Sequence, residues 1–98
     1  MFNNMKTGIE QITEERVKQI SKYGYTPYHD TGYNNKHLLM AALAYLKTAI
    51  GAEETLTESW PMEDWPWDIK YFKDEGYVEN LKKAGALIAA ELDRLNLS

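Results

Sequence analysis

The sequence predicts an all-α domain with three main helices and a long tryptophan-rich connection packed across them. Apolar residues recur at helical spacing in three stretches, at about residues 8–23, 35–50 and 77–95. The connection from Ala52 to Gly76 separates the second stretch from the third and contains all three tryptophans. A chain of 98 residues suits a single domain, in which about 60–65% of the unfolded surface becomes buried.

The first predicted helix begins with a capping box. Thr7 and Glu10 have the spacing at which each side chain can bond the other's backbone amide. The apolar face that should pack in the core comprises Ile9, Ile12, Val17, Ile20 and Tyr23. We expect the opposite face, which includes Glu15, to meet solvent or the acidic connection.

The second predicted helix is apolar on nearly every side. Residues 37–50 read HLLMAALAYLKTAI, and a helix of this kind must be buried all round. Two companion helices in a small monomer would not cover it. The sequence therefore predicts a homo-oligomer, with this helix or the 77–95 helix at its interface.

The third predicted helix has apolar residues in alternating steps of three and four. This spacing is typical of a seam between packed helices. The seam comprises Val78, Leu81, Gly85, Ile88, Leu92 and Leu95, and it is widened by Ala84, Leu87 and Ala90. Gly85 predicts close approach of a neighbouring backbone, and Glu79 and Lys83 are spaced for an ion pair on the exposed side.

Composition excludes several classes of protein. The chain has no cysteine and no run of 18 apolar residues, which predicts a cytoplasmic protein that neither contains disulfides nor enters a membrane. The net charge is −4, with nine carboxylates against two lysines between Glu53 and Glu79. Without a basic stripe the chain is not expected to bind long nucleic acids.

Three ordered blocks of sequence are distinctive. They read ERVKQISKYGYTPYHD over residues 15–30, WPW over residues 65–67 and KAGALIAAELDRL over residues 83–95. Over about Glu14 to Leu95 the chain resembles a family of small phage and prophage proteins. The resemblance implies a phage or prophage origin and an accessory task in the cytoplasm of an infected bacterium. It implies no particular activity, and Thr31 replaces the second acid that often follows His-Asp in that family.

Catalytic patterns are weak. His29 and Asp30 form a pair like that of HD-type phosphohydrolases, but the other histidine, His37, follows the pair rather than preceding it. The pair can bind a divalent metal with further ligands, or can hydrogen-bond its own loop. The carboxylates around Glu53 and Glu58 lack the spacing of a helical Mg²⁺ site, and no serine lies in a nucleophile motif. We therefore predict neither a metal nor another cofactor.

The aromatic residues in and beside the connections suggest ligand binding, because tyrosine and tryptophan rings can stack on a base. The predicted ligand-binding residues are Arg16, Tyr25, Tyr28, His29, Asp30, Trp65, Trp67 and Lys83. We expect them to converge in one pocket, although the Trp-Pro-Trp segment can instead seal the open side of the core. The leading hypothesis is a non-enzymatic phage protein that sequesters a small nucleotide-type ligand such as a host defence signal. A small metal-dependent nucleotide hydrolase and an acidic protein-binding inhibitor are the alternatives.

Overall fold

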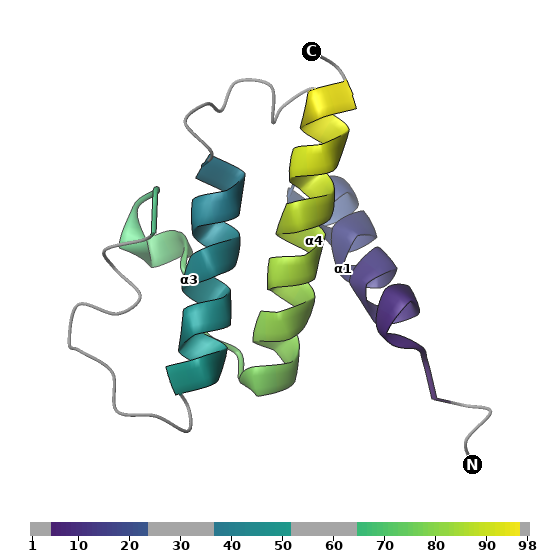
Figure 1. Ribbon diagram of the computed structural model, residues 1–98, viewed down its shortest axis with the longest axis horizontal. Helices are drawn as coiled ribbons and strands as arrows, with labels where there is room; N and C mark the ends of the chain where they lie inside the picture. Colours follow the sequence, from purple (N-terminus) through teal and green to yellow (C-terminus); the bar gives the residue numbers. More distant parts are fainter. Residues whose placement is uncertain (1–4, 24–36, 52–64, 97–98) are drawn as a thin grey trace.

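The computed structural model describes residues 5–23, 37–51 and 65–96, and all regular structure in them is helical (Figure 1). The α-helices are α1 (Gly8–Tyr23), α3 (His37–Gly51) and α4 (Tyr77–Asn96), and a 3-10 turn, η2, spans Ile69–Tyr71. The predicted three-helix, all-α fold is confirmed. Within these ranges no helix has the length and apolar character needed to cross a membrane.

The helix starts follow from local hydrogen bonds. At α1 the Thr7 amide donates to Glu10 Oε1 at 2.8 Å, and the Glu10 amide donates to Thr7 Oγ1 at 3.1 Å, so the predicted capping box is confirmed. Before η2, the Asp68 carboxylate accepts from the Lys70 amide. Before α4, Gly76 adopts a φ of 101°, a conformation that glycine tolerates and other residues rarely adopt.

Helix α4 is the central element of the structure. Helix α3 runs antiparallel beside it, and α1 crosses it on its other side (Figure 1). Among the described residues α1 makes no contact with α3, so α4 alone joins them.

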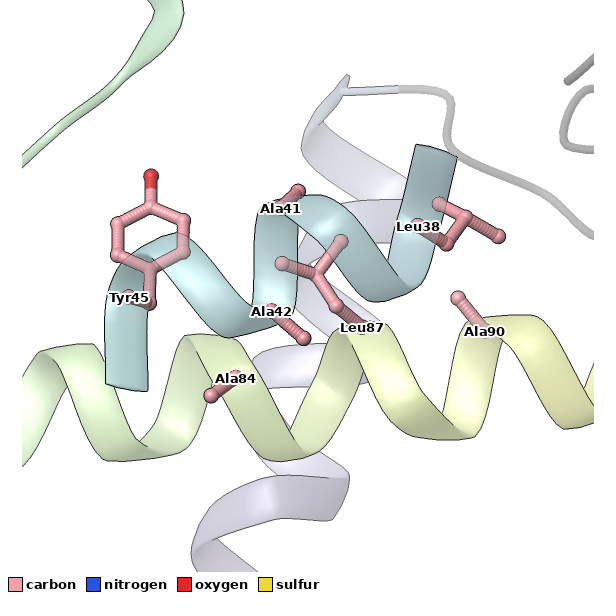
Figure 2. Packing of buried hydrophobic residues seen from close by; sticks show 7 residues of the cluster. All are labelled: Leu38, Ala41, Ala42, Tyr45, Ala84, Leu87 and Ala90. Atoms are coloured by element: carbon pink, nitrogen blue, oxygen red, sulfur yellow. The ribbon is translucent and has the colours of Figure 1, made fainter. Parts of the chain in front are cut away.

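The core lies between α3 and α4 and is rich in alanine (Figure 2). Its buried members are Leu38, Ala41, Ala42, Tyr45, Ala84, Leu87 and Ala90. Small side chains on facing positions let two helices approach closely, since the interaxial distance depends on the side chains at the contact. Leu46, Trp65, Trp67 and Phe72 pack against this core, so the described part of the tryptophan-rich connection, residues 65–76, packs on the helices as predicted.

Helix α1 meets α4 at Gly85. A Cβ atom built on Gly85 would lie 2.6 Å from Ile12 Cδ1 and 2.9 Å from Ile12 Cγ1. Real Cβ atoms do not come this close to a neighbour. A close contact at Gly85 is therefore present, but the neighbour is the side chain of Ile12 and not the backbone that the sequence predicted.

The face of α4 predicted to be its core seam was wrong. Apart from Gly85, the seam residues are 40–61% exposed: Val78, Leu81, Ile88, Leu92 and Leu95. The buried face consists of the alanines and Leu87 together with the polar residues Asn80, Lys83 and Glu91. The predicted widening of the seam through Ala84, Leu87 and Ala90 is confirmed, because these residues are buried. Apolar spacing missed the polar members of the buried face, which take part in hydrogen bonds and ion pairs instead of being excluded from the interior.

Two related expectations were also wrong. On α1, Ile9 and Val17 of the predicted core face are exposed and Glu15 of the opposite face is buried. Ile12 and Ile20 of the predicted face are half-buried. On α4, Glu79 pairs with Lys82 at 3.0 Å, and Lys83 pairs elsewhere.

Candidate functional site

Four aromatic residues gather over the middle of α3, and we call them the aromatic cluster: Tyr45, Trp65, Trp67 and Phe72. The Tyr45 ring stacks on Phe72 with centroids 4.8 Å apart, and Trp65 meets Tyr45, Trp67 and Phe72 edge to face at 5.1–5.5 Å. These are favoured geometries for aromatic pairs. Tyr45 is buried, whereas Trp65 and Trp67 keep part of their surface in solvent.

Lys83 lies beside this cluster, and its side chain is buried, with 9% of its surface exposed. Its Nζ donates to the Lys73 carbonyl at 2.7 Å, forms an ion pair with Glu75 Oε1 at 2.5 Å and lies 5.3 Å from the centroid of the Tyr45 ring. A buried ammonium is costly unless it is paired and hydrogen-bonded, and these partners meet that requirement. Lys83 therefore ties α4 both to the aromatic cluster and to the segment that follows η2.

That segment, residues 72–76, is held by further polar contacts. The Tyr45 hydroxyl accepts from the Lys73 amide at 3.2 Å. The fully buried Asn80 donates from Nδ2 to Asp74 Oδ1 at 2.9 Å. The aromatic cluster is thus fixed from both sides, by side chains of α3 and α4.

The Glu75–Lys83 ion pair predicts a specific acid dependence of stability. The hydrogen bond and the charge of Lys83 lower the pKa of Glu75 below its ordinary value of 4.5. The ionised form favours the folded state, so its contribution is complete above that value and is lost as the pH falls below it. We expect Glu75→Gln to lower the melting temperature at pH 7 and to reduce the further fall of melting temperature in acid. Equal acid-induced falls in both proteins, in thermal melts from pH 7 to pH 3, would contradict this assignment.

Arg16 occupies a different part of the molecule. Its Nε and Nη2 both donate to Asp93 Oδ2 at 3.3 Å, and its side chain is 8% exposed. On α4, Asp93 lies nine residues beyond Ala84, which belongs to the same core cluster as Tyr45. That separation is about 13 Å along the helix axis. A second ion pair joins Glu91 and Arg94 nearby, at 2.7 Å.

The predicted ligand-binding residues are therefore placed unevenly. Lys83, Trp65 and Trp67 meet around Tyr45, whereas Arg16 pairs with Asp93 near the end of α4. The remaining predicted residues, Tyr25, Tyr28, His29 and Asp30, lie outside the described residues. Within the described part of the chain, no group of three or more histidine, cysteine, aspartate or glutamate residues could hold a metal ion.

Sequence reasoning missed two members of the site. Tyr45 was predicted only as part of an apolar helix. In the structure its ring contacts Lys83, Trp65 and Phe72. A tyrosine within an alanine- and leucine-rich helix is the signal that was present, because a buried hydroxyl needs a partner. Glu75 was counted only as part of an acidic stretch, and its pairing depends on the bend at Gly76.

Comparison with known proteins found no match among family models, curated proteins or solved structures.

Proposed function

We propose that the chain is a non-catalytic binding protein that captures a small nucleotide-type ligand at the edge of the aromatic cluster. The observation that carries this proposal is the pair of tryptophans, Trp65 and Trp67, held in fixed orientation yet partly exposed. Rigid aromatic faces bind bases by stacking, at a cost in conformational entropy lower than that of mobile side chains.

Two lysines beside the cluster supply the charge that a phosphate needs. Lys70 and Lys73 are exposed, and they flank the tyrosine of η2 and the phenylalanine of the cluster, Tyr71 and Phe72. Lys70 already lies over the Tyr71 ring, 5.1 Å from its centroid. Lys83 is less suited to this role, because its ammonium is enclosed and paired with Glu75. In this proposal the base stacks on the tryptophans and the phosphates face Lys70 and Lys73.

The carboxylates near the two lysines have positively charged or hydrogen-bonding partners, which weakens their repulsion of a bound phosphate. Glu75 is neutralised by Lys83, and Asp74 accepts from the Asn80 amide and the Gly76 backbone. Asp68 is the cap of η2. The balance between these acids and the two lysines makes binding sensitive to salt, since exposed charges are screened at high ionic strength.

The resemblance to phage and prophage proteins supports a biological setting for this activity. A small protein that sequesters a nucleotide signal without converting it would serve as a counter-defence factor in the host cytoplasm. The metal-dependent hydrolase and the acidic inhibitor remain the competing proposals, and both give different results in the test below.

A thermal-shift screen with mono-, di- and cyclic nucleotides, with and without Mg²⁺, tests the proposal. We expect at least one class to raise the melting temperature without metal. Lys70→Gln combined with Lys73→Gln should weaken that shift, because the phosphates lose their cations. Lys82→Gln is the matched control, since this lysine lies on α4 and pairs with Glu79.

Each alternative has its own signature in the screen. Stabilisation that requires metal and decays with time supports the hydrolase. Absence of any shift across the nucleotides contradicts the capture proposal and leaves the protein-binding inhibitor.

We also propose that the chain works as a homo-oligomer. The apolar side chains predicted to be covered on the second and third helices stay exposed on α3 and α4 in the single chain. Leu43, Ile50 and Leu92 are examples, at 42%, 60% and 61% exposure. Exposed aliphatic residues that gather on one surface are typical of interaction sites.

A further inference from the structure

The exposed aliphatic residues of α3 and α4 form two regular stripes. On α3 the exposed members are Leu39, Leu43 and Ile50, with the half-buried Leu46 continuing the line at its edge. On α4 the stripe consists of Leu81, Ile88, Leu92 and Leu95, and the exposed Val78 lies outside it. We call these seven exposed residues the α3–α4 apolar face.

Helical geometry places both stripes on the same side of the helix pair. Each residue turns the chain by about 100° about the helix axis. On α3 the stripe is rotated by about 130° about that axis from the core residues, and on α4 the corresponding rotation is about 110°. The rotation has the same sense along each helix. Because α3 and α4 run antiparallel, equal rotations in one sense bring the two stripes to one side of the pair (Figure 1).

Helix α1 does not cover this surface. It contacts α4 through Gly85 and Asp93, which lie further round the helix than the stripe. The stripe residues keep 37–61% of their surface exposed with α1 in place. The face is therefore open over both helices.

The spacing of the two stripes indicates what kind of surface would cover them. The steps are four, three and four on α3, counting Leu46, and seven, four and three on α4. Both series fit the heptad spacing at which side chains interdigitate with another helix. None of the seven residues is charged, so these residues themselves add no like-charge repulsion between two identical faces. A second copy offers the same two helices with the same spacing, which meets the self-complementarity that a two-fold interface requires.

The size of the face fits such a dimer. Each stripe is about 16–21 Å long and each helix about 10 Å across, so the pair presents a footprint of about 400 Å². Protruding side chains make the accessible area larger than this flat footprint. Stable interfaces remove about 800 Å² from each partner and weaker ones less, so the face suits a dimer of moderate stability.

We infer that the α3–α4 apolar face binds the same face of a second copy, so that two helix pairs stack into a four-helix arrangement. The inference rests on the self-association proposed above and adds the surface, the partner and the symmetry. Four-helix bundles bury apolar stripes of this kind between two such layers. The aromatic cluster packs on the core of α3 and α4, and none of its members belongs to this face.

Mass measurements by light scattering at about 1–100 µM, a range that brackets a moderate dimer, test the inference with charge-introducing variants. We expect the wild type to approach twice 11.3 kDa as the concentration rises. Leu43→Lys and Ile88→Lys should each raise the dissociation constant at least tenfold. Val17→Lys is the matched control, because Val17 is an exposed aliphatic residue on α1, outside the face. Circular dichroism of each variant verifies that its helices remain.

Single-cysteine crosslinking provides a second readout on a chain that has no cysteine of its own. Leu92→Cys should yield a crosslinked dimer with a bifunctional maleimide, and Val17→Cys should not. The inference is overturned if neither Leu43→Lys nor Ile88→Lys weakens the dimer and if cysteines at positions 92 and 17 crosslink equally. That result would leave self-association through another surface intact. A wild type that stays monomeric up to 100 µM overturns both.

Discussion

Replacement of Trp65 by alanine is expected to lower the free energy of unfolding by about 3 kcal/mol, the low end of the range for tryptophan truncation in a core because part of the ring is exposed. Trp65 contacts three other aromatic rings, and its Nε1 donates to the Asp68 carbonyl at 3.0 Å. Truncation removes all of these contacts and opens the core beside Tyr45. In a domain of this size such a loss is a large fraction of the total stability.

Chemical denaturation of Trp65→Ala beside Tyr71→Ala measures this effect. Tyr71 is an aromatic residue of the same short segment, but it is exposed and lies outside the aromatic cluster. We expect Tyr71→Ala to cost less than 1 kcal/mol, as exposed substitutions generally do. Equal losses in the two variants would mean that the tryptophan-rich segment does not stabilise the core.

Gly85→Leu is expected to destabilise the protein despite leucine's higher helix propensity. Leucine gains up to about 1 kcal/mol over glycine within a helix. Against this, a side chain at position 85 collides with Ile12, and overpacking of a well-packed contact costs about 1–3 kcal/mol or more. The net result should be a lower melting temperature and a loosened α1.

Two companion variants locate the cause of this loss. Ile12→Ala removes the atoms that the new side chain meets, so the double variant should recover part of the stability lost by Gly85→Leu. Gly8→Ala is the matched control, because a Cβ there meets nothing within 4 Å. A raised melting temperature for Gly85→Leu, or the absence of any coupling with Ile12, would show that α1 does not rest on Gly85.

The helices themselves were predictable because their signals are local. The capping box of Thr7 and Glu10 predicts the residue at which α1 begins. Gly85 lacks a side chain, and the side chain of Ile12 fills the space that this leaves. The face that α4 buries was not predictable in this way. The buried Lys83 and Asn80 depend on partners supplied by residues 73–75, and no periodic pattern encodes those partners.

The candidate site was predictable only in part for the same reason. Trp65 and Trp67 were identified from their residue type and their place beside prolines, which limit the paths of the chain. Their contact with Tyr45 depends on how the segment after them returns to α3, which residue types do not specify. Arg16 was grouped with them because an arginine suits a phosphate, but its partner Asp93 is 77 positions away in the sequence.

Equilibrium dialysis with recovery of the ligand separates capture of a nucleotide from its conversion. The nucleotide that gives the largest thermal shift is dialysed against the protein, and both compartments are then analysed by chromatography. We expect excess nucleotide on the protein side, recovered chemically unchanged after denaturation. The excess should be smaller for the variant that carries both Lys70→Gln and Lys73→Gln. A product peak that grows with time, or equal nucleotide concentrations on the two sides, would contradict capture without conversion.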